Sequence, residues 1–490
     1  MLDEAAIRQQ KLDTMRTDGV DPYPARSGRT ALVGDVQANF DAWMKGEHEV
    51  VLCGRLMTVR VHGGLLFADL KDASGRLQLF VKKDVIGDTA FDQFRDRMDP
   101  ADMVEVRGVP FLTQRGERSL KVSAWKPLVK ALLPLPDKWH GLQDVEQRFR
   151  KRYLDLLMSE DVTARMVARS HVISAMRAHL DGQGFIEVET PTLQPIYGGG
   201  FAKPFKTRHN ALEADFYLRI SDEMYLKRLL VGGFERVYEI TKVFRNEGID
   251  RDHNPEFTMF EAQIAYEDYR YGMDLFEALV ESAAKKAIGT TDIVHGDTTV
   301  SVARPWKRMR LVEAVKEIGG VDPEAWTSAE DAKKAIRDRI PERKRGELDR
   351  METLGEIVAF AFEELVEEQL IQPTIIYDYP VEVSPLAKKA ADHRFVERFE
   401  VFALGSEIGN NYSELNDPTD LERRFIAEKK KEAAGFDEAH QTDEDYLEAI
   451  RHGLPPACGL GIGIDRLVML LTGAANIKEV ILFPTLRPER

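Results

Sequence analysis

The residue types best suited to chemistry lie together in segment 244–263, FRNEGIDRDHNPEFTMFEAQ. Extended stretches are expected on both sides of its loop, which is dense in glycine, aspartate, histidine and asparagine. Positions two apart in a strand share a face, so Arg245 and Glu247 are predicted to point the same way. Phe257 and Glu261 share a face of the second strand, and a hairpin would bring all four side chains to one surface.

That surface has a definite chemical capacity. An arginine can bind a phosphate or a carboxylate through two parallel hydrogen bonds. A phenylalanine ring can stack on a flat base, and a glutamate can hold an ammonium group. The alternative interpretation is a charged hairpin with internal ion pairs, which suits an isolated Arg-x-Glu better. For the complete string we favour a ligand-binding surface over that alternative.

A second candidate segment is GLGIGIDRLVMLL, residues 459–471. Its three glycines allow a backbone to pass close to a ligand. Arg466 stands at the start of an apolar run that reads as a buried helix, and a helix N-terminus favours anions. The spacing is not GxGxxG, because Ile464 stands where the last glycine would be, so a dinucleotide site is a poor interpretation.

A third segment, 397–416, contains two groups of polar residues. Glu400 and Glu407 are acids on either side of a glycine turn, although Glu400 taken alone would read as a surface carboxylate. The residues after the turn alternate at a period of two and should share one strand face. They are Asn410, Tyr412 and Glu414.

The N-terminal third is expected to form a small β-barrel after a helical lead-in over 1–45. Short stretches of alternating polarity are separated by turn residues, and five such strands fit an OB-fold, although other small barrels fit the pattern equally well. The predicted strands are 49–59, 64–70, 76–82, 103–109 and 119–126. A proline-spaced linker follows, so we place the domains at 1–135 and 136–490.

Beyond the linker, helical and extended stretches are mixed without regular alternation. This pattern favours an α+β fold with an antiparallel sheet flanked by helices over a doubly wound parallel sheet. Residues 306–370 read as mostly helical and separate two strand-rich blocks, so they are predicted to be an insertion.

Composition sets further limits. Of 490 residues, 43% are hydrophobic and 31% charged, which is typical of a globular protein. The formal net charge of −15 argues mildly against a nucleic-acid partner, so any RNA contact must depend on local patches. Two cysteines cannot form a disulfide framework and do not suggest zinc. The charged N-terminus lacks a secretory signal, and we expect a cytoplasmic protein without membrane spans.

These segments, taken together, resemble those of the class II aminoacyl-tRNA synthetases. Segment 244–263 is similar to motif 2 of that class and 459–471 to motif 3. VETPTL at 188–193, after an amphipathic helix around 166–181, resembles motif 1, a dimer-interface element. Within the class, YLRISDEMYLKRLLVGGFERVYEI (217–240) and SEIGNNYSELND (406–417) resemble the lysyl-tRNA synthetases.

The resemblance implies an activity, a fold and partners. Lysine and ATP would give lysyl-adenylate and pyrophosphate, and the lysyl group would then pass to the terminal 3′-hydroxyl of tRNA(Lys), releasing AMP. The fold would be an N-terminal OB-fold barrel that binds the anticodon, followed by a class II catalytic domain, in a homodimer. Mg²⁺ would bridge the ATP phosphates from Glu400 and Glu407.

The resemblance also assigns roles to individual residues. Arg245 and Arg466 would be the catalytic residues. The ATP set would be Arg245, Glu247, His253, Asn254, Phe257, Glu400, Glu407 and Arg466. The lysine set would be Gly199, Glu223, Arg245, Glu261, Gln263, Asn410, Tyr412 and Glu414. The anticodon set would be Arg60, Phe67, Gln78 and Phe80, although Phe67 and Phe80 would also serve as barrel core.

Two positions depart from the family pattern. The family usually has a tyrosine where this chain has Gln263, and a glycine is common where it has Asn411. Three other activities are compatible with parts of the pattern. They are an aspartyl- or asparaginyl-tRNA synthetase, a paralogue that transfers lysine to a protein such as elongation factor P, and an inactive RNA-binding subunit.

Overall fold

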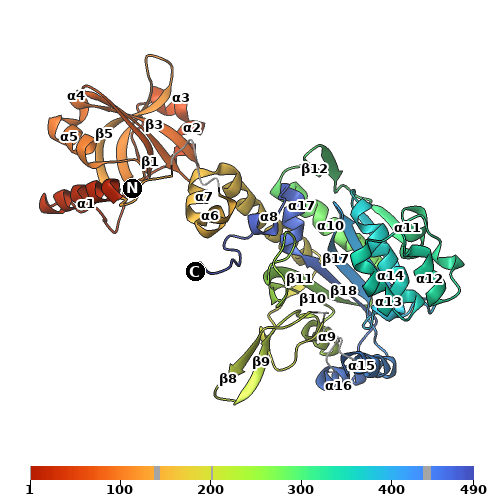
Figure 1. Ribbon diagram of the computed structural model, residues 1–490. Coiled ribbons are helices and arrows are strands. Elements are labelled where there is room, and N and C mark those ends of the chain that lie inside the picture. The colour runs from red at the N-terminus through yellow and green to blue at the C-terminus, as the bar shows by residue number, and fades with distance from the viewer. Residues whose placement is uncertain (1, 137–143, 200–201, 434–442, 490) are drawn as a thin grey trace. The chain divides into compact units, whose positions relative to one another are not determined.

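The computed structural model describes residues 2–136, 144–199, 202–433 and 443–489 (Figure 1). The chain divides into two compact units, Met1–Gln143 and Asp144–Arg490. Within the described residues no helix is long and apolar enough to cross a membrane.

The first unit is a closed five-stranded barrel with the strand order β1-β2-β3-β5-β4, which confirms the predicted OB-fold. Its core comes from every second residue, such as Leu66, Ala68 and Leu70 on β2, because alternate side chains of a strand face opposite sides. The strands are β1 (Val50–His62), β2 (Leu65–Asp72), β3 (Gly75–Lys82), β4 (Met103–Leu112) and β5 (Arg118–Val129). The helices are α1 (Leu2–Thr17), α2 (Val33–Ala38), α3 (Phe40–Lys45), α4 (Lys83–Ile86) and α5 (Asp88–Arg97).

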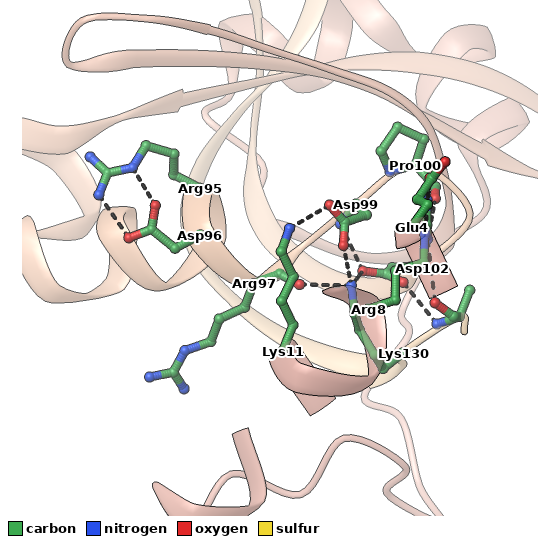
Figure 2. A network of polar contacts seen from close by, with 11 residues as sticks. Glu4, Arg8, Lys11, Arg95, Asp96, Arg97, Asp99, Pro100, Asp102 and Lys130 are labelled. Carbon is green, nitrogen blue, oxygen red and sulfur yellow. Dashed lines mark hydrogen bonds and ion pairs between the residues drawn. The ribbon is translucent and has the colours of Figure 1, made fainter. Parts of the chain in front are cut away.

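A buried ionic network fastens α1 to the barrel (Figure 2). The side chain of Lys130 is fully buried, and its Nζ lies 2.5 Å from Asp99 and 2.7 Å from Asp102. Lys11 of α1 reaches Asp99 at 2.6 Å, and Arg8 donates a hydrogen bond to the carbonyl oxygen of Pro100. A fully buried ammonium group is stable only when anions surround it. The network therefore holds together α1, the segment from Asp99 to Asp102, and Lys130.

The second unit is built on an eight-stranded sheet with the order β14-β15-β16-β17-β18-β11-β10-β6 (Figure 1). Neighbouring strands run antiparallel except for the two edge pairs, β14–β15 and β10–β6, so the α+β prediction is confirmed. The strands are β6 (Ile186–Glu187), β10 (Arg236–Phe244), β11 (Glu256–Ala265), β14 (Lys307–Arg310), β15 (Thr374–Pro380), β16 (Phe395–Ala403), β17 (Ser406–Ser413) and β18 (Ala457–Gly463).

One face of this sheet packs on helices to form the main core. Phe260, Ala262 and Ile264 of β11 contribute to it, together with Phe276 and Leu467 from the covering helices. Those helices are α8 (Glu160–Asp181), α10 (Tyr269–Ala287) and α17 (Ile464–Thr472). The apolar side chains of β11 therefore lie on the core face of the sheet. Its alternate side chains point to the opposite face.

Smaller elements surround the sheet. The segment after β14 folds into α11 (Leu311–Glu317), α12 (Ala329–Ile336), α13 (Arg345–Arg350) and α14 (Leu354–Leu365), which share an apolar cluster with residues of β14, β15 and β16. A second cluster contains α9 (Glu223–Val231), α15 (Pro418–Ala433) and α16 (Glu444–Arg451). The others are α6 (Val145–Arg150), α7 (Arg152–Met158), β7 (Leu193–Gln194), β8 (Lys206–His209), β9 (Ala214–Leu218), β12 (Asp292–His295) and β13 (Thr298–Ser301).

Candidate active site

A cavity of about 390 Å³ lies on the face of the sheet opposite the main core. Strands β11, β17 and β18 form its floor, and the β10–β11 loop and the first turns of α9 and α17 supply its walls. Most residues predicted for ATP or amino acid binding line it. They are Gly199, Glu223, Arg245, Glu247, His253, Asn254, Phe257, Glu261, Gln263, Glu407, Asn410, Tyr412 and Arg466. Glu400 and Glu414 are not among the lining residues; Glu414 is buried and Glu400 is partly exposed.

The β10–β11 hairpin presents the first group of these side chains. Phe257 and Glu261 face the cavity from β11, whereas Phe260 and Ile264 face the core. Met259 and Gln263 complete the cavity-facing row. The period of two therefore sorts this strand into a core face and a ligand face.

The prediction that Arg245 and Glu247 share a strand face is wrong, because β10 ends at Phe244. The ladder closes with Phe244 opposite Glu256. The next residue on the partner strand is Pro255, which accepts a hydrogen bond from the Arg245 backbone but has no N–H with which to return one. Both side chains nevertheless line the cavity, from irregular backbone.

Arg245 is placed for an anionic ligand next to an aromatic ring. Its guanidinium carbon lies 5.2 Å from the centroid of the Phe257 ring. Its Nε is buried and has no hydrogen-bond partner. Burial lowers the pKa of Arg245 from its ordinary value, while Glu247 and Glu261 act in the opposite direction. An arginine stays charged in proteins, so the unpartnered N–H and the charge are both free to meet a phosphate or carboxylate.

Arg466 forms the other cationic wall. It lies in the first turn of α17, and its Nη1 donates a hydrogen bond of 2.8 Å to the backbone oxygen of Glu407. Its Nη2 lies 3.0 Å from Nε2 of His253 in the β10–β11 loop. Asp465 anchors the same turn, because its carboxylate accepts from the backbone N–H of Thr258 and pairs with Arg169 at 2.5 Å.

Three carboxylates, Glu367, Glu400 and Glu407, influence one another's charge near these cations. Glu400 accepts a hydrogen bond of 2.9 Å from the Tyr379 hydroxyl and pairs with Arg398. Burial raises the pKa of Glu400, and the charge of Glu407 adds to that effect. Burial also raises the pKa of Glu367 to about 7, again with contributions from Glu400 and Glu407.

These acids fit a divalent cation bound jointly with a phosphate ligand. A cation would relieve the repulsion that raises the pKa of Glu400, and Mg²⁺ prefers one or two carboxylates plus phosphate oxygens to a cage made wholly of protein. Among the described residues, no group of three or more acidic, histidine or cysteine side chains could hold a metal ion.

The far end of the cavity is acidic and crowded. The hydroxyl of Tyr412 donates to Glu223 at 2.5 Å, and Ser221 donates to Glu261 at 2.8 Å. Burial raises the pKa of Glu261 to about 7, with a further contribution from Glu223, and burial raises that of Glu414 to about 7.

Two glycines make this crowding possible. A Cβ on Gly459 would lie 2.3 Å from both Gln263 and Glu414, so those side chains meet only because position 459 has none. Gly199 has a φ of +82°, and a Cβ there would lie 2.8 Å from the Ser221 hydroxyl oxygen.

The two positions that depart from the family pattern contain unpartnered polar atoms. Oε1 of Gln263 has no hydrogen-bond partner, and both side-chain amide atoms of Asn411 are buried without one. A Cβ on Gly272 would lie 2.3 Å from the Asn411 amide, so α10 approaches this side chain closely. Gln263 faces the cavity, whereas Asn411 lies on the opposite side of β17.

Several residues next to the site were not predicted. Lys227 is fully buried against Glu223 and Glu414, and Arg398 lines the cavity. Asp465 also lines the cavity, whereas Glu367 does not line it and interacts electrostatically with Glu400 and Glu407. The burial of Lys227 could not be predicted from the sequence, because a Glu and a Lys four positions apart on a helix usually form an exposed surface pair.

The residues predicted for anticodon binding lie on the barrel. Phe67 and Phe80 are half-buried on its outer face with ring centroids 5.5 Å apart, so they do not fill the core. Phe111 continues the row at 5.1 Å from Phe80. Arg60 is exposed opposite Phe67, while Gln78 is buried and accepts a hydrogen bond from Ser119.

Comparison with known proteins adds two family matches and several full-length relatives. Residues 144–487 match the class II tRNA synthetases (D, K and N), and residues 50–128 match the OB-fold nucleic acid binding domain. Proteins named lysine–tRNA ligase from Moorella thermoacetica, Enterococcus faecalis and Bacillus subtilis are each 48% identical to the chain. The alignments cover 99% of this chain and 98%, 97% and 97% of those proteins, respectively.

Proposed function

Since the chain belongs to the class II lysyl-tRNA synthetases, we propose that it is a lysine–tRNA ligase that activates lysine with ATP and transfers it to tRNA(Lys). The observation that carries the proposal is a single cavity with cations and an aromatic ring at one end and buried acids at the other. Such a cavity suits a nucleotide beside an amino acid that has a positively charged side chain.

The activation step needs placement and charge neutralisation more than covalent help. The carboxylate of lysine attacks the α-phosphate of ATP in line, and pyrophosphate leaves. Arg245 binds the carboxylate and the α-phosphate, while Arg466 neutralises charge on the phosphates. Phe257 stacks on the adenine, and Glu247, His253 and Asn254 complete the nucleotide site. When bound, Mg²⁺ supplies charge neutralisation at the phosphates from Glu400 and Glu407.

Lysine recognition follows from the acids. Glu223 and the backbone at Gly199 bind the α-amino group, and Asn410 assists Arg245 with the carboxylate. Glu261 and Glu414 attract the ε-ammonium group, with Gln263 near that group and Tyr412 beside the alkyl chain. Aspartate is rejected because its side-chain carboxylate would meet buried acids, and asparagine brings no charge to pair with them.

The remaining parts of the proposal concern the partners. The barrel, within domain 1–135, binds the anticodon with Arg60, Phe67, Gln78 and Phe80, because half-exposed aromatics are suited to stacking single-stranded bases. The catalytic domain, 136–490, forms a homodimer through motif 1 and includes the helical insertion at 306–370. A cytoplasmic location follows from the role in translation.

Pyrophosphate exchange into ATP tests the substrate. Wild-type protein should exchange with lysine and not with aspartate or asparagine, and Arg466→Ala should lower the exchange rate by about a hundredfold or more. Purified tRNA(Lys) and elongation factor P should then be compared as acceptors of labelled lysine. Exchange with aspartate or asparagine instead of lysine, or transfer to the protein acceptor instead of tRNA, would refute the proposal.

A further inference from the structure

Lys227 lies directly behind the acidic end of the cavity. It is on α9, one turn after Glu223, and its side chain has no exposed surface. Its Nζ forms an ion pair with Glu223 and a second, of 2.5 Å, with Glu414. The same nitrogen lies 5.1 Å from the centroid of the Tyr412 ring. One buried ammonium group therefore contacts three residues of the proposed lysine site.

The charges explain why a cation is needed there. Without Lys227, the negative charges of Glu223 and Glu414 would have no shared cation between them, and a buried carboxylate such as Glu414 that lies near a like charge tends to take up a proton. Glu223 raises the pKa of Glu414 through its negative charge, and Lys227 lowers it. Burial opposes the charge on Lys227, but Glu223 and Glu414 outweigh it and raise the pKa of the ammonium group above its ordinary value. A protonated carboxyl would be a poor partner for a substrate ammonium group.

Building on the proposed function, we propose that Lys227 is a positioning residue for substrate selection. Its ammonium group holds the carboxylates of Glu223 and Glu414 in place at the acidic end of the cavity and favours the charged form of Glu414, which suits a substrate with two ammonium groups. Lys227 does not line the cavity and does not touch the substrate itself. It belongs to the lysine site through the acids that it holds.

The groups around Glu414 define what a pH experiment reports. Lys227 and Glu223 face it from α9, Tyr446 from α16, and Tyr412 precedes it on β17. Gln263 of β11 and Cys458 of β18 complete its surroundings. Of these groups Lys227 is the cation. Replacing it with methionine should move the protonation of Glu414 to higher pH, so lysine affinity should be lost at a higher pH than in the wild type.

A second buried lysine supplies a matched control. Lys130 in the barrel is also without exposed surface and also bridges two carboxylates, Asp99 and Asp102 (Figure 2). Lys130→Met removes an equally buried charge from the other unit. It should lower the unfolding temperature without changing amino acid activation.

The experiment measures pyrophosphate exchange between about pH 6 and pH 9 for wild type, Lys227→Met, Lys227→Arg and Lys130→Met. For Lys227→Met we expect KM for lysine at neutral pH to rise about tenfold or more, with partial recovery at alkaline pH, and KM for ATP to change less than about twofold. Lys227→Arg keeps the charge and should retain the wild-type pH profile even if KM rises.

Three results would overturn the inference. The first is a Lys227→Met protein with the wild-type lysine KM and pH profile. The second is a parallel rise of both KM values that tracks a lower unfolding temperature, which indicates a purely structural role. The third result applies if Lys227→Met does not fold. It is a pH profile of Lys227→Arg that is displaced to higher pH than that of the wild type. A wild-type protein without lysine-dependent exchange would instead refute the proposed function, and this inference with it.

Discussion

Nε2 of His253 lies 3.0 Å from Nη2 of Arg466, and Nδ1 of the same ring lies 2.9 Å from Asp250. A guanidinium group can only donate, so Nε2 accepts and the ring proton is on Nδ1, where it donates to Asp250. The imidazole thus joins the β10–β11 loop to the first turn of α17. These two segments are more than two hundred positions apart in the sequence, and both line the cavity.

Removing Arg466 should therefore reduce activation far more than it reduces stability. Arg466→Ala is expected to lower the exchange rate by about a hundredfold or more, because a preorganised positive charge at the phosphates is lost. Arg451→Ala is the control, since Arg451 makes an exposed ion pair with Glu422. Exchange kinetics and thermal unfolding of both variants provide the measurement. Undiminished exchange by Arg466→Ala would place the ATP site elsewhere.

Gly199→Ala should weaken lysine binding through crowding. The new methyl group would approach the Ser221 hydroxyl, which holds Glu261, and the positive φ adds backbone strain. We expect KM for lysine to rise about tenfold. Gly233→Ala separates the two effects, because Gly233 has a φ of +97° and open space around its Cβ position. That control should lose about 1 kcal/mol of stability and keep its lysine KM. Equal KM values for both variants would contradict the crowding.

Lysine affinity should fall as the solution is made mildly acidic. The pKa values of Glu261 and Glu414 are raised to about 7, and only their ionised forms attract an ammonium group. KM for lysine should therefore increase as the pH falls through about 7, while KM for ATP changes less. Glu414→Gln should raise KM for lysine and flatten this pH dependence. A lysine KM that is constant from about pH 6 to pH 8 would show that these acids do not bind the substrate.

Stability without substrate should change with pH in the opposite direction. The ordinary pKa of a glutamate is 4.5, so between that value and about 7 the folded protein holds protons on Glu261 and Glu414 that the unfolded chain releases. The free energy of unfolding should therefore decrease as the pH rises through this window. Chemical denaturation at several pH values measures it, and Glu414→Gln should show a smaller slope. An identical slope in both proteins would argue against a raised pKa at Glu414.

Phe67→Ala and Phe80→Ala should separate the two halves of the reaction. Stacking of one base on an aromatic ring is worth about 1–3 kcal/mol, so KM for tRNA in aminoacylation should rise about tenfold. Pyrophosphate exchange does not need tRNA and should be unchanged. Val85→Ala, at an exposed apolar residue of α4, is the control. A Phe80→Ala protein with normal aminoacylation would remove this face from the anticodon site.

The sequence by itself determined the features that depend on neighbouring residues. The alternation along 257–263 assigned Phe257 and Glu261 to one face, because successive side chains of a strand point to opposite sides. The turn residues between short apolar stretches indicated five barrel strands, and the motif strings indicated the family. Short-range periodicity and turn residues depend only on neighbouring positions, so they can be recognised in the sequence without knowing what packs against them.

Tertiary structure alone decided which of these residues are buried and what they meet. Lys227 reads as half of an exposed helix pair, yet α9 packs against β17 and α16 and encloses its charge. Phe67 could have filled the barrel, but the core register places it outside. Arg245 leaves the strand because Pro255 ends the ladder. Burial is set by elements distant in the sequence. Burial in turn shifts the pKa of each acid and so determines which side chains in the cavity are charged.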